Sequence, residues 1–142
     1  MEVCFLAKIE GISHITFIVK DLKKSAYLFK ELFGAEEIYD SQEKNYSLSR
    51  EKFFLINDLW LALMEGESLD QQTYNHLAFK IQAKDYEFYL DKIAELGLEI
   101  KSGRSRVEGE AQSLYFYDYD NHLFEFHTGS RAERLEKYKN LA

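Results

Sequence analysis

The sequence predicts an α+β protein made of two βαβββ modules. Two segments, which begin at His14 and His76, resemble each other: HITFIVKDLKKSAYLFKELFGAEEI and HLAFKIQAKDYEFYLDKIAELGLEI. Each segment starts with alternating apolar and polar residues, changes to helical spacing, and then reaches a glycine. The distance from that glycine to the end of the module also repeats. Such an internal repeat indicates a duplicated supersecondary unit.

The glycines set a common register for the two halves. Gly34 and Gly66 are 32 residues apart, and so are Gly97 and Gly129. Gly34 and Gly97 stand where each predicted helix ends, at a position that favours a residue with positive φ. The second glycine of each pair closes an apolar, strand-like run. The register therefore divides the chain into two modules of similar length.

The first module spans about residues 12–66. Its opening strand alternates from His14, which is typical of a strand with one buried face. A helix follows, and its apolar positions keep the 3.6-residue period: Leu22, Ala26, Phe29, Leu32 and Phe33. Two further strand candidates are YSLSREKFFLI at 46–56 and LWLALMEG at 59–66.

The second module spans about residues 74–129, after the short link ESLDQQT. Its helix is marked by Tyr86, Tyr89, Leu90, Ile93 and Leu96. The strand candidates are SLYFYDYDN at 113–121 and HLFEFHTG at 122–129. A polar, amphipathic run, RAERLEKYK, predicts a C-terminal helix at about 131–139. Residues 1–142 are expected to form a single domain.

Composition excludes several classes of protein. The 142 residues include 25 acidic and 18 basic side chains, for a formal charge of −7. Nucleic acid is an unexpected partner because phosphate binding needs clustered Lys and Arg. No apolar run is long enough for a membrane span, and the N-terminus does not resemble a signal peptide. The one cysteine, Cys4, forms no internal disulfide, so we expect a soluble, cytoplasmic protein.

A metal site is the chemistry that the repeat favours. His14 and His76 are equivalent, so modules paired about a pseudo-twofold axis would make them face each other in one cavity. Glu125 lies 28 residues after its helix-ending glycine, and Ala62 holds that position in the first module. A carboxylate within an apolar strand must be paired, protonated or bound to a cation. His14, His76 and Glu125 are therefore the predicted ligands.

Two imidazoles and one carboxylate leave coordination positions open, as a metal that activates a substrate requires. Manganese, iron(II), zinc and nickel all suit this ligand set. The two remaining histidines are expected elsewhere. His122 falls in the turn-like DYDNH, where it would face solvent or bond within the turn, and His127 is expected to support the site rather than bind the metal.

Several segments of the chain resemble those of a known family. Over about residues 10–139, the chain is similar to fosfomycin resistance proteins of the vicinal oxygen chelate superfamily. The similar segments are GISHITFIVKDL, ELFGAEEIY, LWLALMEG, TYNHLAFKIQ and SLYFYDYDNHLFEFHTG. The strings SREKFFL, GESL and RVEGE resemble the FosX type, which comprises metal-dependent fosfomycin hydrolases. The turn DYDNH departs from the Asp-Pro-Asp-Gly pattern common in the superfamily, without loss of a ligand.

The resemblance implies a chemistry. A divalent ion, usually Mn²⁺, would bind the epoxide oxygen and a phosphonate oxygen of fosfomycin. Water would open the epoxide, giving an inactive diol and antibiotic resistance, with Glu51 as the general base. The substrate-binding residues implied are Thr16, Tyr74, Ser113, Tyr115 and Arg134, and Arg106 in the loop SGRSRVEGE is a further candidate for binding the anion. Arg suits the phosphonate because its planar fork binds two oxygens at once.

The resemblance also implies a homodimer, in which modules swap across chains to complete each metal site. Two other functions stay open. A thiol transferase of the same fold would use a small thiol in place of water. A drug-sequestering protein would bind fosfomycin without chemistry, although such relatives typically lack the metal ligands that this chain retains.

Overall fold

The computed structural model describes residues 6–101 and 111–141. The first module contains β1 (His14–Val19), α1 (Leu22–Phe33), β2 (Glu36–Asp40), β3 (Glu51–Ile56) and β4 (Leu59–Glu65). The second contains β5 (His76–Lys80), the 3₁₀ turn η1 (Ala83–Asp85), α2 (Tyr86–Glu95), β6 (Ile100–Lys101), β7 (Ser113–Tyr117) and β8 (Leu123–His127). The last helix is α3 (Arg131–Asn140). No helix in the described ranges is long and apolar enough to cross a membrane.

Each module forms its own four-stranded sheet, and the two sheets have the same topology. The strand orders are β1-β4-β3-β2 and β5-β8-β7-β6. In each sheet the opening strand lies parallel to the last one and the other pairs are antiparallel. The predicted α+β fold with two βαβββ modules is therefore confirmed. The strand candidate at 46–56 was too long, because β3 begins only at Glu51.

The helix ends follow from local sequence. The side chain of Asp21 accepts a hydrogen bond from the Lys24 N–H and caps the start of α1. Gly34 ends α1 with φ of 63° and Gly97 follows α2 with φ of 69°. Both angles lie in the left-handed region, where a side chain would be strained, so the two glycines stop the helices as predicted.

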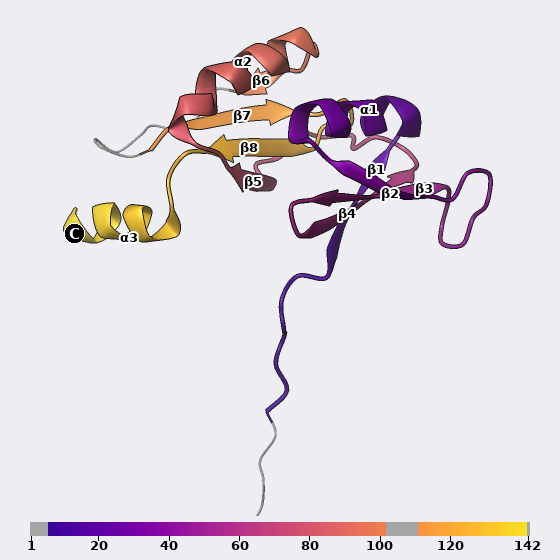
Figure 1. Cartoon of the computed structure of the whole chain (residues 1–142), viewed down its shortest axis with the longest axis horizontal. Coiled ribbons are helices and arrows are strands. Elements are labelled where there is room, and N and C mark those ends of the chain that lie inside the picture. The colour runs from indigo at the N-terminus through magenta and orange to yellow at the C-terminus, as the bar shows by residue number, and fades with distance from the viewer. Residues whose placement is uncertain (1–5, 102–110, 142) are drawn as a thin grey trace, which may run out of the picture.

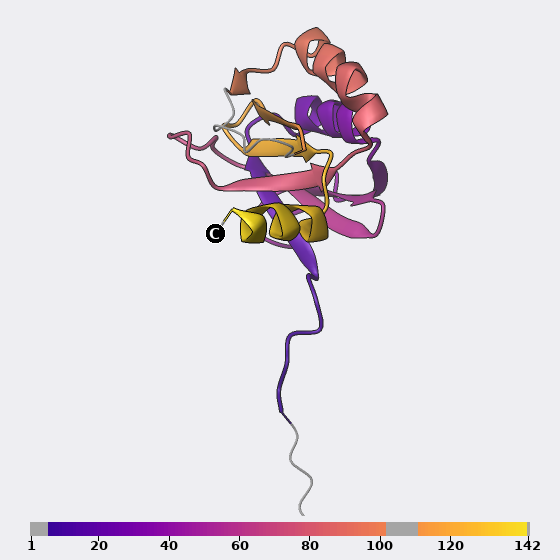
Figure 2. The ribbon, with the colours of Figure 1, turned by 90° about the vertical axis from the view of Figure 1, so that its left-hand side faces the viewer.

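One apolar core serves both modules. Helices α1 and α2 lie on the same side of the sheets, whereas α3 lies on the opposite side (Figures 1 and 2). The ring of Phe33, at the end of α1, packs against four rings of the second sheet: Phe79, Phe116, Phe124 and Phe126. Buried residues of both modules form a single cluster. The helix-bearing faces of both sheets are thus buried together, and their other faces are directed away from this core.

A buried carboxylate holds the two modules in register. Asp120, in the β7–β8 turn, is 2% exposed. It accepts hydrogen bonds from the Lys20 N–H at 2.9 Å, from the Ser25 hydroxyl at 3.4 Å and from the Ser68 hydroxyl. Because these donors belong to the β1–α1 corner and the inter-module link, Asp120 ties three separate segments together.

We predict that Asp120→Ala lowers the free energy of unfolding by about 2 to 3 kcal/mol, since it leaves a part-buried N–H and two hydroxyls without their common acceptor. Urea denaturation followed by circular dichroism measures the change. Asp91→Ala, at an exposed position of α2, is the matched control. An unchanged midpoint for the Asp120 variant would contradict the proposed tie.

Candidate functional site

The predicted ligands lie on the sheet faces directed away from the core. His14 is paired with Trp60 and Thr16 with Ala62. In the second sheet, Ala78 is paired with Glu125. Ala62 and Glu125 therefore occupy equivalent places, each opposite the residue two positions after the histidine of its module. The sheet register agrees with the register that the glycines predicted.

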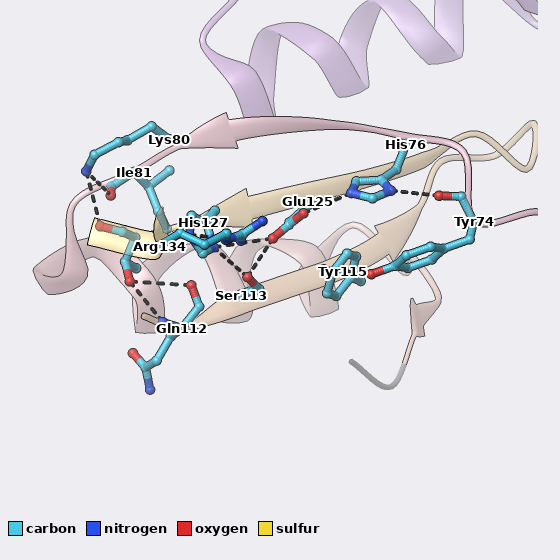
Figure 3. A network of polar contacts seen from close by, with 11 residues as sticks. Tyr74, His76, Lys80, Ile81, Gln112, Ser113, Tyr115, Glu125, His127 and Arg134 are labelled. Atoms are coloured by element: carbon cyan, nitrogen blue, oxygen red, sulfur yellow. Dashed lines mark hydrogen bonds and ion pairs between the residues drawn. The ribbon is translucent and has the colours of Figure 1, made fainter. Parts of the chain in front are cut away.

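The second module brings two of the predicted ligands together (Figure 3). His76 Nε2 lies 3.0 Å from Glu125 Oε1. On the other side of the ring, Nδ1 lies 2.7 Å from the main-chain oxygen of Tyr74. A carbonyl oxygen only accepts, so Nδ1 carries the proton and donates it there. Nε2 then faces the carboxylate, where it offers a lone pair if the ring is neutral and donates a proton if the ring is charged.

This arrangement fits a bound cation. Nε2 of His76 and a carboxylate oxygen of Glu125 lie 3.0 Å apart, a distance that either a proton on Nε2 or a metal ion in its place would explain. Their contact is favourable when a positive charge is shared between them. A histidine that binds a metal characteristically donates its other N–H to a backbone carbonyl, which fixes both tautomer and ring orientation, as Tyr74 does here. The donor set of His76 and Glu125 thus suits a divalent ion.

Glu125 is the centre of a buried polar network on this face. The residue is only 3% exposed. Its Oε2 accepts a hydrogen bond from the Ser113 hydroxyl at 2.5 Å. The same hydroxyl lies 2.7 Å from His127 Nδ1, and Arg134 on α3 lies 3.3 Å from His127 Nε2. Four of the residues singled out in the sequence, from β7, β8 and α3, are therefore connected.

Two tyrosines border the same face. The Tyr74 hydroxyl donates to the Tyr115 hydroxyl at 3.0 Å, and the Tyr74 ring packs on His76 with a centroid separation of 4.8 Å. Tyr115 is 3% exposed and Tyr74 is 49% exposed. A separate cavity of about 580 Å³ is lined in part by His76, Glu125 and Arg134.

The first module carries the other half of the predicted site. The ring of His14 packs against Trp60 with centroids 4.3 Å apart, and Phe53 meets Trp60 edge-on at 5.2 Å. The Trp60 indole N–H is buried and has no hydrogen-bond partner among the described residues. Thr16 is exposed on the same face.

Glu51 begins β3 on this same face. It is paired with Met64 of β4, and Met64 is paired in turn with Ile18 of β1, two residues beyond Thr16. Glu51 is 8% exposed, and its N–H donates to the Ser41 hydroxyl at 3.0 Å while its carbonyl accepts from the Ser41 N–H. These paired bonds fix where the strand begins. His14, Thr16 and Glu51 therefore share one sheet face.

Within one chain, His14 does not join His76 and Glu125 in a three-ligand group. Among residues 6–101 and 111–141, no three His, Cys, Asp or Glu side chains form a group able to hold a metal. The reason is the common core: with both helix-bearing faces buried against each other, the faces that carry His14 and Glu125 cannot also meet. One chain presents two half-sites.

The remaining predictions have mixed outcomes. His122 bonds within its turn, where Nδ1 lies 2.8 Å from Asp118 Oδ2, and it does not face solvent because its side chain is 10% exposed. Arg106 lies outside the described residues. His127 was expected to support the site, and it joins Ser113 to Arg134, although these two contacts themselves were not predicted. Its position two residues after Glu125, on the same strand face, was the available signal.

Comparisons with known proteins agree on the family. Residues 11–126 match the model of the Glyoxalase/Bleomycin resistance protein/Dioxygenase superfamily. The chain is 59% identical over 130 residues to the fosfomycin resistance protein FosX of Listeria innocua, covering 92% of this chain and 98% of that protein. It is 38% identical over 137 residues to the metallothiol transferase FosB of Bacillus licheniformis, covering 94% and 84%.

Solved structures lead to the same family. A variant of FosX from Listeria monocytogenes, crystallised with Mn(II) and 1S,2S-dihydroxypropylphosphonic acid, superimposes with a TM-score of 0.85 at 51% identity, covering 92% of this chain and 99% of that one. FosX from Mesorhizobium loti gives a TM-score of 0.81 at 49% identity, covering 91% and 99%. The chain therefore belongs to the glyoxalase/bleomycin resistance protein/dioxygenase superfamily and, within it, to the family of the FosX fosfomycin resistance proteins.

Proposed function

We propose that this protein is a Mn²⁺-dependent hydrolase that opens the epoxide of fosfomycin with water and so confers resistance to the antibiotic. The observation that carries the proposal is the ligand pair of the similar FosX structure, Mn(II) and a dihydroxypropylphosphonic acid. A vicinal diol is what remains when water opens an epoxypropyl phosphonate.

His76 and Glu125 would hold the ion, together with His14 of a second chain. The short distance between His76 Nε2 and Glu125 supports this assignment, since a metal ion between them would explain it. When bound, Mn²⁺ supplies Lewis acidity at the epoxide oxygen and positions the phosphonate. Two imidazoles and one carboxylate leave room for both of these oxygens.

Glu51 is assigned as the general base. In this proposal its carboxylate takes a proton from water, and the water oxygen forms a bond to the epoxide carbon that bears the phosphonate. The bond from that carbon to the epoxide oxygen breaks, and the released oxygen becomes the second hydroxyl on gaining a proton. Glu51 suits this role because it is only 8% exposed, so its carboxylate meets little water until a water molecule enters the site.

The phosphonate would be bound by Arg134, whose guanidinium borders the cavity beside Glu125. Tyr74 and Tyr115 offer hydroxyls from the same face, and Arg106 is a further candidate from residues 102–110. Thr16 would approach the epoxide oxygen from the first module. These local groups bind an anion although the whole chain carries a net charge of −7.

A homodimer would complete the site. Strands β1 and β5 each end a sheet, so each has one edge without a strand partner in the described ranges. Unpaired edges favour association with another strand or chain. If β1 of one chain lies beside β5 of another, His14 approaches the partner's pair of ligands. The buried, unpartnered N–H of Trp60 beside His14 also favours a second chain on this face.

We propose that the protein works in the cytoplasm. We also propose that residues 1–142 form a single domain. Its one cysteine cannot form an internal disulfide, which suits a reducing compartment.

The function is tested by incubating the purified protein with Mn²⁺ and fosfomycin, without any thiol, and following the reaction by phosphorus NMR. We expect a diol signal that depends on Mn²⁺ and disappears with a chelator. Adduct formation only after a small thiol is added would identify a thiol transferase. Stoichiometric drug binding without product, and without bound metal, would identify a sequestering protein.

Glu51→Gln separates water activation from metal binding. We expect kcat for diol formation to fall by about 10²- to 10⁴-fold, because the amide cannot accept the proton. Mn²⁺ affinity, measured by isothermal titration calorimetry, should stay unchanged, since Glu51 is not an assigned ligand. Thiol-independent turnover at the wild-type rate would rule out Glu51 as the base. Glu136→Gln, at an exposed position of α3, is the control.

Mixing two inactive variants tests the shared site. His14→Ala and Glu125→Ala should each be inactive alone. A mixed dimer has one site that takes His14 from one chain and the intact Glu125 from the other, so refolding an equal mixture should restore about a quarter of wild-type activity. No recovery, although mixed dimers form, would mean that each site is built within one chain.

A further inference from the structure

Four side chains on the second module form a continuous hydrogen-bonded chain. Arg134 lies 3.3 Å from His127 Nε2, and His127 Nδ1 lies 2.7 Å from the Ser113 hydroxyl oxygen. That hydroxyl lies 2.5 Å from Glu125 Oε2. Figure 3 shows these groups in a row along β7, β8 and the start of α3. This row of hydrogen bonds links Arg134, which is assigned to the phosphonate, with Glu125, which is assigned to the metal.

The chemistry of the end groups fixes the direction of every bond in the row. A guanidinium has no acceptor, so Arg134 donates and His127 Nε2 accepts. The neutral imidazole then carries its proton on Nδ1, which lies 2.7 Å from the Ser113 oxygen and farther, at 3.4 Å, from Glu125 Oε2, so it donates to Ser113. A carboxylate oxygen only accepts, so Ser113 directs its only proton to Glu125.

We propose that His127 is a positioning residue that acts in two directions: through Ser113 it orients Glu125 for the metal, and through Nε2 it orients Arg134 for the phosphonate. It follows that the Ser113 hydroxyl serves the carboxylate rather than the substrate. This inference rests on the proposed function for the identity of the ion and of the anion. It departs from the substrate-binding role that resemblance implied for Ser113.

The packing around His127 supports a fixed ring. Its side chain is 13% exposed. At Gly129, an added Cβ would lie 3.0 Å from His127 Nε2 and 2.7 Å from the Cβ of Ala111, so only glycine fits without displacing a neighbour. The ring therefore lies close to the backbone of Gly129, between β8 and α3 in the sequence, where a larger residue would displace it.

The row is also specific to the module that carries the carboxylate. Ser113 is paired with His127, and Glu51 is paired with Met64 at the equivalent place in the first sheet. Met64 can replace neither ring nitrogen of His127 as a hydrogen-bonding group. The first module, which has Ala62 where the second has Glu125, therefore lacks both the carboxylate and the pair that would orient it.

Ser113→Ala tests the direction of the Ser113 bond. We expect Mn²⁺ affinity, measured by titration calorimetry in the absence of fosfomycin, to fall about 10-fold, as for the loss of a group that orients a metal ligand. The KM for fosfomycin at saturating Mn²⁺ should change less than about 2-fold by the same argument. The opposite pattern, with unchanged Mn²⁺ affinity and a raised KM, would return Ser113 to the substrate.

Two substitutions of His127 separate its two contacts. Asn places an amide near the position of Nδ1, so His127→Asn keeps a donor for Ser113 and loses the acceptor for Arg134. Gln reaches the position of Nε2, so His127→Gln keeps that acceptor and loses the donor. We expect the Asn variant to raise KM about 10-fold at nearly wild-type Mn²⁺ affinity, and the Gln variant to weaken Mn²⁺ binding about 10-fold.

Thermal unfolding of each variant accompanies these measurements, and Lys139→Gln at an exposed position of α3 is the control. Equal losses of Mn²⁺ and fosfomycin binding in both His127 variants, with a lowered Tm, would show that the ring only supports the fold. No change in either variant would also overturn the inference. The calorimetric result uses Mn²⁺ alone, so it can be judged even if the wild-type protein forms no diol.

Discussion

The packing of two sheets on one core is the constraint from which the rest of this structure follows. Each sheet has two faces, and within the chain only one can be buried in the apolar layer that α1 and α2 help to form. Phe33, which is partly buried, packs against that layer and contacts four rings of the second sheet. Burying these faces leaves the opposite faces, which carry His14, Glu51 and Glu125, outside the core.

Duplication provides the scaffold, and differences between the copies provide the chemistry. The equivalent pairs are Ala62 with Glu125, Met64 with His127 and Glu51 with Ser113, as the strand registers show. The second copy carries a carboxylate with the groups that orient it. The first copy carries the equivalent histidine, His14, and has its carboxylate, Glu51, at a different place. A near-symmetric fold thus supports an asymmetric division of roles, which a reaction with distinct metal and base requires.

Much of this could be predicted from sequence because it depends on local rules. Alternation, helical spacing and the glycines at 34 and 97 predicted both modules, and the shared register placed Ala62 and Glu125 at equivalent positions. Periodicity tells which residues share a face. It cannot tell which faces of two sheets are buried together, so the expectation that two chains complete each metal site came from the family resemblance and not from periodicity.

The polar details depended on tertiary contacts in the same way. The burial of His122 against Phe17, whose rings are 4.8 Å apart, joins residues from different modules. The bond from Ser113 to Glu125 depends on strand pairing together with the tautomer that Arg134 imposes on His127. Neither is encoded within a short stretch of sequence.

Because the two half-sites lie apart, the number of complete sites depends on the concentration of the protein. Under the proposed pairing, an isolated chain has no complete site, however well it folds. At concentrations below the dissociation constant of the pair, the amount of complete site then rises with the square of the amount of chain. A cell that doubles its expression would gain about four times the catalytic capacity in that range, and dilution would remove it equally steeply.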